Sequence, residues 1–204
     1  MKVEKFVNKI LSSNSYIIHD KEEVSVWIID PGDSKQLINW IRQKSLIVKG
    51  ILLTHSHIDH IYGVNDIIKE NPSLEIYASK NAIEGLYTPK ANGSYYMEMN
   101  YTVNSNKVNY LANQDTVELW NGKMAFVFDT PGHDYDCISF YYNKYLFTGD
   151  ALIPGVKPHV KSKKADKQVA YKTIDWIKKT FDEDVFICPG HKEICTLKSI
   201  TIPL

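Results

Sequence analysis

Three histidines and one aspartate fall within the stretch His55-Ser56-His57-Ile58-Asp59-His60. Neutral imidazole and carboxylate are ligands that suit zinc and similar first-row metal ions. Because alternate side chains of an extended loop point to the same side, His55 and His57 can close on one ion. Asp59 and His60 can then be presented to a second position nearby. At this chain's histidine and aspartate frequencies, such a cluster arises by chance with odds on the order of one in two thousand, so the stretch predicts a metal site.

The segments on either side predict where this cluster lies. The apolar run Ile51-Leu52-Leu53 precedes it and is typical of a buried strand. Segment 61–70 follows with apolar residues at helical spacing and ends before Asn71-Pro72. We therefore expect the histidines on a tight loop between a strand and a helix, which is where ligand sites of open α/β sheets usually lie.

Three further polar residues each follow a glycine at the end of a predicted strand, namely His133, Asp150 and His191. A glycine is expected where the backbone must turn sharply close to an ion. Taken singly, each residue is more typical of a structural turn than of a ligand. Together with the first cluster they place five of the seven histidines at strand ends, which favours the metal interpretation. The two remaining histidines, His19 and His159, are interpreted as non-ligands.

Periodicity and turn residues predict a mixed set of elements that could position these side chains. The predicted strands are 6–10, 15–19, 24–29, 51–53, 74–78, 116–120, 123–128, 138–142, 145–148 and 185–188. Predicted helices are one capped by Asp33 or Ser34, one over 61–70, one around 81–86 and one over 166–181. This order suits two sheets packed face to face with helices outside.

Segment 87–110 differs from the rest of the chain. It carries five of the thirteen tyrosines and five asparagines, with weak periodicity. We predict a long excursion over the surface, because long loops in compact domains tend to be binding lids or to be disordered. A tyrosine-rich packing flap is an almost equal alternative.

Length and composition set bounds on the class of protein. A chain of 204 residues most naturally forms one domain, 1–204. The 24 basic and 24 acidic residues balance, so no global field favours nucleic acid or an anionic membrane. No segment resembles a signal peptide or a membrane span. The three cysteines suit neither a disulfide framework nor a structural zinc knot, so a cytoplasmic location is expected.

Four motifs together resemble the metallo-β-lactamase-fold hydrolases. They are His55-x-His57-x-Asp59-His60, Gly132-His133, Thr148-Gly149-Asp150 and Pro189-Gly190-His191. The turn Asp30-Pro31-Gly32 also matches a recurrent early feature of that superfamily. The resemblance covers nearly the whole chain. It implies an α+β fold, a four-layer αββα sandwich with the metal site at one edge of the two sheets.

The resemblance also implies seven metal ligands arranged around two ions. Carried over position by position, the ligands of the first ion are His55, His57 and His133, those of the second are Asp59, His60 and His191, and Asp150 bridges the two. Two zinc ions per chain are expected, while iron or manganese would suit the same donors.

Within the superfamily, Asp150 after Thr148-Gly149 looks like the glyoxalase II and lactonase branch. That likeness implies a dinuclear hydrolase that uses a metal-bridging hydroxide on a small ester, thioester or lactone. Two departures argue against glutathione thioesters as substrates. His133 is followed by Asp134 rather than by Thr-Pro-Gly, and the chain ends about a dozen residues past His191, where glyoxalase II-like chains continue into a helical domain.

Other roles and functions stay open. Asp59 is the candidate catalytic residue, which would orient the shared water and pass a proton to the leaving group. Lys161, Lys163 and Lys164 could bind an anionic group of a small-molecule substrate, although a solvated loop is as good an interpretation. Cys137 could supply a thiolate, but a small buried side chain is favoured.

Two alternative functions are a mononuclear iron sulfur (persulfide) dioxygenase on the same fold and a phosphodiesterase or β-lactamase-type hydrolase. Metal analysis separates the first alternative, because hydrolysis predicts about two zinc ions per chain and the dioxygenase predicts one iron with oxygen uptake. A nuclease is disfavoured by the neutral charge. The sequence leaves the oligomeric state open.

Overall fold

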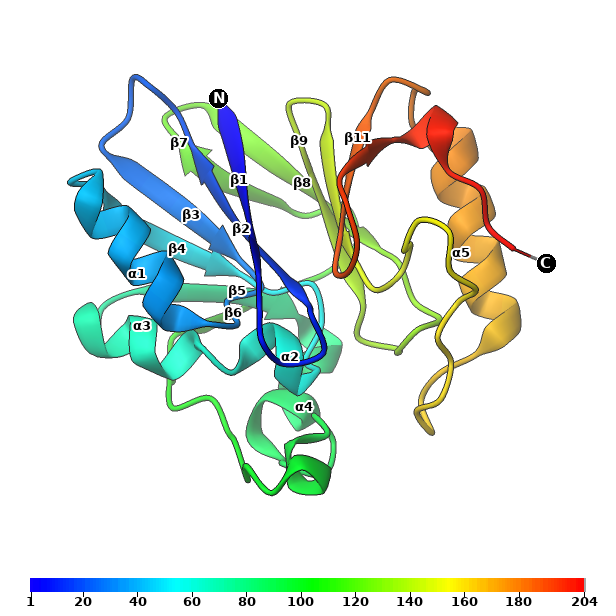
Figure 1. Cartoon of the computed structure of the whole chain (residues 1–204), viewed down its shortest axis with the longest axis horizontal. Helices are drawn as coiled ribbons and strands as arrows, with labels where there is room; N and C mark the ends of the chain where they lie inside the picture. Colours follow the sequence, from blue (N-terminus) through cyan, green and yellow to red (C-terminus); the bar gives the residue numbers. More distant parts are fainter. Residues whose placement is uncertain (204) are drawn as a thin grey trace. The chain divides into compact units, whose positions relative to one another are not determined.

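The computed structural model describes residues 1–203 of the chain. The chain divides into two compact units, Met1–Leu111 (unit 1) and Ala112–Leu204 (unit 2). Among the described residues each unit contains one six-stranded sheet, whose strands can be followed in Figure 1. The prediction of a single domain over 1–204 stays a prediction, and the two units are described in turn.

In unit 1 the strands lie in the sheet in the order in which they occur in the chain. They are β1 (Lys2–Val7), β2 (Asn14–His19), β3 (Ser25–Ile29), β4 (Ile47–Leu52), β5 (Glu75–Ser79) and β6 (Val108–Leu111). The first three pair antiparallel, and β3 to β6 pair parallel. Parallel neighbours need crossover connections, and helical segments supply them. These segments are α1 (Ser34–Gln43), α2 (Ile58–Ile61), α3 (Val64–Glu70), η1 (Lys80–Ala82), α4 (Ile83–Tyr87) and η2 (Ser94–Met97).

Unit 2 is built mainly from hairpins. Its sheet has the order β12-β11-β10-β9-β8-β7, and only the pair β10 and β11 is parallel among the pairings described. Its strands are β7 (Thr116–Trp120), β8 (Lys123–Asp129), β9 (Ile138–Tyr142), β10 (Tyr145–Gly149), β11 (Phe186–Pro189) and β12 (Cys195–Thr196). Helix α5 (Lys167–Thr180) lies in the crossover between the parallel pair, and η3 (Leu197–Ser199) follows β12.

Apolar faces of the helices hold the strands of each unit in place. In unit 1, Leu37 of α1 and Ile67 of α3 belong to one buried cluster with Ile51 of β4. In unit 2, Ile177 of α5 belongs to a buried cluster with Ile187 of β11. Burial of one such side chain contributes about 1.5–3 kcal/mol, so these clusters fix the strand ends from which the polar loops start.

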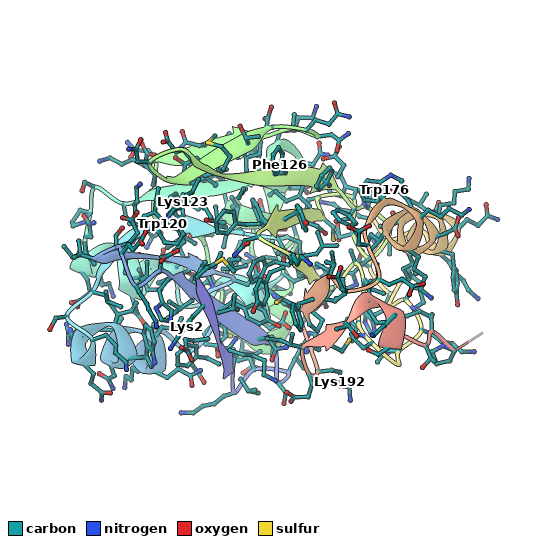
Figure 2. The ribbon with its side chains drawn as sticks, turned by 90° about the horizontal axis from the view of Figure 1, so that it is seen from above. Lys2, Trp120, Lys123, Phe126, Trp176 and Lys192 are labelled. Atoms are coloured by element: carbon teal, nitrogen blue, oxygen red, sulfur yellow. The ribbon has the colours of Figure 1, made fainter. Side chains whose placement is uncertain are left out.

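Aromatic rings extend this packing in unit 2. Trp176 of α5, labelled in Figure 2, lies with its ring centroid 5.5 Å from that of Phe128 and 5.9 Å from that of Phe181. The hairpin of β7 and β8 turns at Asn121-Gly122, as its sequence predicts, and the Lys123 ammonium lies 5.8 Å from the buried Trp120 ring. The contact of Trp176 with Phe128 therefore anchors helix α5 to the end of β8 that leads to His133.

The predicted elements are confirmed for the most part, and the differences have local causes. The first strand covers Lys2–Val7 rather than 6–10, because Asn8 already turns the chain by donating its backbone N–H to the carbonyl of Ser13. Asp33 occupies the N-cap position of α1 as predicted, but its carboxylate accepts hydrogen bonds from the Lys9 N–H and the Tyr62 hydroxyl instead of capping the helix. The two-residue strand β12 was not predicted.

The prediction of one helix over 61–70 is wrong. Gly63 separates α2 from α3, and its N–H donates to the carbonyl of Pro31 at 2.9 Å. A Cβ atom at Gly63 would lie 2.1 Å from the carbonyl oxygen of Gly32, so the backbones approach too closely for another residue. The helical turn α2 also begins earlier than predicted, at Ile58, so Asp59 and His60 lie in it rather than on a loop.

Segment 87–110 is more ordered than its sequence predicts. Its last residues enter the sheet as β6, so the predicted excursion ends earlier than expected. The buried amide of Asn92 donates to the carbonyls of Gly85 and Tyr101, and the backbone carbonyl of Asn92 accepts from the N–H of Ile58. These contacts favour the packing flap, and a role as a lid stays a prediction. No helix of residues 1–203 is long and apolar enough to cross a membrane.

Candidate metal centre

The donors of unit 1 lie at the end of β4 and in α2. His55, Asp59 and His60 are at most 5 % exposed, and His57 is half-buried. The ring centroid of His55 lies 4.7 Å from that of His57 and 4.3 Å from that of His60. Unit 1 therefore brings together all four of its predicted ligands.

Asp30, in the turn after β3, orients this set. Its Oδ2 atom lies 3.1 Å from Nδ1 of His60 and accepts the Thr54 hydroxyl at 2.6 Å, while its Oδ1 accepts the Thr54 N–H at 2.7 Å. A carboxylate that accepts one ring N–H of a histidine fixes the tautomer and leaves the other nitrogen for a metal. The Nε2 atom of His60 accordingly lies on the side of Asp59, 3.4 Å from its Oδ2.

Buried polar side chains of β2 and of the loop before it hold this turn. The Ser15 hydroxyl donates to the carbonyl of Asp30 at 2.6 Å and accepts from the Gly32 N–H at 2.8 Å. The Ser13 hydroxyl donates to the carbonyl of Asp59 at 2.6 Å. Asn8 donates its side-chain amide to both serines. One small hydrogen-bonded network thus fixes both the turn that carries Asp30 and the helical turn that carries Asp59.

The donors of unit 2 lie just beyond the ends of three strands, after a glycine in each case. The Oδ2 atom of Asp150 lies 3.5 Å from Nε2 of His133 and 3.4 Å from Nε2 of His191. The side chains of His133 and Asp150 are at most 9 % exposed, and that of His191 is 19 % exposed. Unit 2 therefore brings together its three predicted ligands around one carboxylate oxygen.

Glycines make two of these turns possible. Gly149 has φ 49° and its carbonyl accepts from the Gly190 N–H at 2.7 Å, which ties the turns of Asp150 and His191 together. Gly132 has φ 131°, and a Cβ atom there would lie 2.3 Å from the Cα atom of Ala170 in α5. Both conformations are ones that glycine adopts without penalty.

His133 is oriented through its other ring nitrogen. Its Nδ1 atom lies 2.7 Å from the backbone carbonyl oxygen of His159, so the ring donates its Nδ1–H there. Its Nε2 atom then keeps the lone pair on the side of Asp150. This arrangement repeats in unit 2 the orientation that Asp30 gives His60 in unit 1.

The chemistry of both donor sets fits divalent first-row metal ions. Imidazole nitrogens and carboxylate oxygens converge in each unit, they are largely buried, and second partners fix the rings of His60 and His133. Burial and the negative charge of Asp136 raise the pKa of the Cys137 thiol well above its ordinary value. Cys137 is therefore a neutral thiol near pH 7, in agreement with its interpretation as a small buried side chain.

The histidines predicted as non-ligands have other contacts. His19 lies in β2, with its Nε2 atom 3.1 Å from a Glu4 carboxylate oxygen. His159 contacts His133 through its backbone carbonyl, which accepts the His133 Nδ1–H. Of the three candidate lysines, Lys161 and Lys163 are exposed, whereas the Lys164 ammonium lies 4.6 Å from the ring centroid of Tyr135.

Sequence reasoning missed the residues that orient the ligands. Asp30 appeared only as part of a turn, although a buried aspartate directly after an apolar strand is a usable signal. Thr54 and Ser13 gave no signal, and neither did the carbonyl of His159. Their contacts depend on chain segments that are far apart in the sequence.

The comparisons with known proteins agree with these features. The family model described as the metallo-beta-lactamase superfamily matches residues 9–191. A hydroxyacylglutathione hydrolase of Buchnera aphidicola subsp. Schizaphis graminum is 32 % identical over 184 residues, which are 90 % of this chain and 64 % of that relative. The chain spans 48–64 % of the length of the first three curated relatives that it matches.

Solved structures give the same result for the fold. The crystal structure of BLEG-1 B3 metallo-beta-lactamase is similar with a TM-score of 0.89 and 26 % identity, over 97 % of this chain and 95 % of that one. The structure of TTHA1623 in a di-iron-bound form is similar in fold, with a TM-score of 0.82 and 22 % identity, over 96 % of each chain.

These findings confirm the predicted fold class and the predicted similarity to glyoxalase II, the hydroxyacylglutathione hydrolases. The curated relatives are named as hydrolases, in agreement with the predicted class of enzyme. The chain belongs to the metallo-beta-lactamase superfamily.

Proposed function

We propose that the chain is a metal-dependent hydrolase that acts on a small ester, thioester or lactone with a pair of divalent cations. The observation that carries the proposal is the orientation of the ligand rings. In each unit a histidine gives its Nδ1–H to a fixed acceptor, Asp30 for His60 and the His159 carbonyl for His133, and turns Nε2 toward a carboxylate. Family membership and the name of the curated relatives support hydrolysis as the reaction.

The proposal keeps the seven donors and their assignment as the sequence resemblance implies them. The first ion would be held by His55, His57 and His133, the second by Asp59, His60 and His191, with Asp150 as the bridge. Zinc is the expected ion, because sites of histidine and carboxylate without sulfur suit it. Iron and manganese accept the same donors.

When bound, a pair of such cations lowers the pKa of a shared water toward neutrality and polarises a carbonyl group. The chain's own contribution to proton transfer is assigned to Asp59. The hydrogen bond from Ser13 to its carbonyl fixes the main chain, while its carboxylate is directed toward His60. Asp59 would orient the attacking water and pass a proton to the leaving group.

Replacement of Asp59 by Asn tests this role. The amide cannot accept and return a proton, so we expect kcat to fall by about 10²-fold or more in protein loaded with metal to the wild-type content. Metal content is measured beside the steady-state kinetics. A variant with both ions and full activity would show that Asp59 does not transfer the proton.

The basic residues before α5 are proposed to bind an anionic group of the substrate. The triple variant Lys161→Ala, Lys163→Ala and Lys164→Ala should raise KM for an anionic substrate, with little change in kcat, because it removes cations that contact only the non-reacting part. The matched control replaces three exposed lysines of α5, namely Lys167, Lys172 and Lys178. An equal KM in both triple variants would remove this assignment.

Metal analysis and a substrate screen test the proposed function as a whole. Freshly purified protein should contain about two zinc ions per chain and lose its activity reversibly with a chelator. The screen covers thioesters, lactones, phosphodiesters and β-lactams, beginning with hydroxyacylglutathione thioesters because the curated relatives carry that name. One iron per chain with oxygen uptake would favour the dioxygenase, and protein without metal would contradict both enzymes. A cytoplasmic location is part of the proposal.

A further inference from the structure

The turn that carries His133 is held on one side by helix α5. The Thr173 hydroxyl donates to the carbonyl of Pro131 at 2.6 Å, and the Asp166 N–H donates to the carbonyl of Gly132 at 2.9 Å. Gly132 itself lies against Ala170 without room for a Cβ atom. The backbone of the turn is therefore fixed, but these contacts leave the rotation of the His133 ring undetermined.

A second segment acts on the ring itself. We call residues 157–165, between β10 and α5, the basic loop because it carries Lys157, Lys161, Lys163 and Lys164. Its His159 carbonyl accepts the His133 Nδ1–H at 2.7 Å. Loops of this kind are more mobile than the elements that they connect, so a carbonyl on such a loop positions a ligand only if the loop is tied down nearby.

Two contacts tie the loop to the turn. The Lys164 ammonium lies 4.6 Å from the ring centroid of Tyr135, and Ser162, which is closer to His159 in the sequence, contacts Asp134. The Ser162 hydroxyl donates to Oδ2 of Asp134 at 3.0 Å and accepts the Lys164 N–H at 3.2 Å. Oδ1 of Asp134 accepts the N–H of Tyr135 at 2.7 Å, and the carbonyl of Asp134 accepts the N–H of Gly132 at 3.1 Å. Asp134 is 4 % exposed and Ser162 is half-buried, so this is a part-buried, charge-assisted hydrogen bond between the turn and the basic loop.

We propose that Asp134 and Ser162 are positioning residues, which clamp the basic loop onto the turn of His133 so that the His159 carbonyl selects the tautomer and orientation of the His133 ring. The proposal deepens the proposed function and rests on it for its effect on metal binding. Asp134 directly follows the candidate ligand His133, and Ser162 lies three residues beyond His159. The contact between Asp134 and Ser162 therefore joins the same two chain segments as the hydrogen bond from His133 to His159, and it lies next to that bond.

The consequence concerns metal affinity more than stability. Without the clamp the basic loop keeps its chain connections, but the His159 carbonyl no longer stays within hydrogen-bond distance of His133. The ring then exchanges between its two tautomers, and only the tautomer with the proton on Nδ1 presents Nε2 to a metal. Loss of such an orienting partner typically reduces metal affinity 10- to 100-fold.

The first experiment uses the metal-free chain and does not depend on any enzymatic activity. Long-range ¹H–¹⁵N correlation spectra of histidine-labelled protein report the tautomer of each ring, and a His133→Gln variant assigns the His133 signals. We expect His133 to be protonated on Nδ1 in the wild type and to be a mixture of tautomers in Ser162→Ala. Ser162→Thr, which keeps the hydroxyl, should restore the wild-type spectrum.

The second experiment measures zinc affinity by competition with a chelator. Ser162→Ala and Asp134→Ala should each weaken zinc binding about tenfold. The double variant should be no weaker than the weaker single variant, because both substitutions remove the contact between Ser162 and Asp134. The control Ser199→Ala removes an exposed hydroxyl that donates to Thr196 in the same unit, and it should leave zinc affinity and tautomer unchanged.

The outcomes separate the two proposals. Wild-type protein that binds no zinc would contradict the proposed function, while the tautomer spectra would still decide whether the clamp exists. A wild-type His133 signal in Ser162→Ala would overturn the clamp whatever the metal result. Additive losses in the double variant would also overturn it, since they would show two independent effects. Unfolding curves of the metal-free variants show whether any loss reflects misfolding.

Discussion

In unit 1 the four candidate ligands lie within one stretch, 55–60, and a single aspartate at the end of the neighbouring strand orients His60 and holds Thr54 beside His55. In unit 2 the three candidate ligands follow the ends of three strands, β8, β10 and β11. Each comes after a glycine, and two of these glycines, Gly132 and Gly149, have a positive φ. The first set depends on the covalent order of a short segment. The second depends on the assembly of the sheet and on contacts from α5 and the basic loop.

This difference determines how each set responds to substitution. In unit 1 the short stretch 55–60 already brings the donors close together. A change in Asp30 therefore alters the orientation of the His60 ring but leaves the donors near one another. In unit 2 a change in a turn displaces the donor itself, because no neighbouring ligand in the sequence holds it. We therefore expect a bulky substitution in a turn of unit 2 to have a larger effect on the protein than a polar substitution next to residues 55–60 of unit 1.

Gly132→Ala should give the largest effect. The new Cβ atom would meet the backbone of α5 at 2.3 Å, at a φ of 131° that alanine rarely adopts, so we expect a loss of about 3 kcal/mol or more in the free energy of unfolding. Denaturant unfolding measures it. Gly122→Ala is the control, because φ is 71° there but no atom lies within 4 Å, and it should lose only about 1 kcal/mol. Equal losses would show that the close approach of Gly132 to α5 adds nothing to the cost of a positive φ, and the turn of His133 would then not be the sensitive point of unit 2.

Asp30→Asn tests the orientation in unit 1. The amide can no longer accept from both Thr54 and His60 as a carboxylate does, so we expect metal affinity to fall about 10- to 100-fold with the fold retained. Asp33→Asn is the control in the same turn, since Asp33 accepts from Lys9 and Tyr62 instead. Chelator competition measures both variants. A loss in Asp33→Asn as large as in Asp30→Asn would indicate that the turn as a whole matters and not the contact to His60.

The cysteines give the smallest expected effect. Burial raises the pKa values of Cys137 and Cys188, so both are thiols near neutral pH and become thiolates only above the pH at which ordinary cysteines ionise. Iodoacetamide at pH 8 should therefore modify half-buried Cys195 first, as read by mass spectrometry of peptides. Rapid modification of Cys137 in the folded protein would show that unit 2 opens around its ligands, which would sharpen the contrast with unit 1.

The convergence of the candidate ligands within each unit follows from local sequence signals. His55 to His60 lie next to one another, and His133, Asp150 and His191 each follow a strand and a glycine, so the signal is local. The same holds for the hairpin at Asn121-Gly122, whose turn type follows from two residues.

The orienting contacts are not local and could not be predicted in the same way. Asp30 and His60 are 30 residues apart, and Asp134 and Ser162 are 28 residues apart. Helix 61–70 was misjudged for the same reason, because Gly63 is required by the close approach of Gly32 and not by its own neighbours in sequence. Propensity describes a segment in isolation, and tertiary approach overrides it here.

The crossover between the parallel strands β10 and β11 has a further consequence. Such a connection is not part of any ladder, so residues can be inserted into 151–166 without a shift of strand register. A change of length that spares His159 and Ser162 would move the lysines of the basic loop and leave the hydrogen bonds to His133 and Asp134 in place. If the basic loop binds substrate as proposed, selection for a new substrate would act on this connection first. His159 and Ser162 would have to stay in contact with His133 and Asp134.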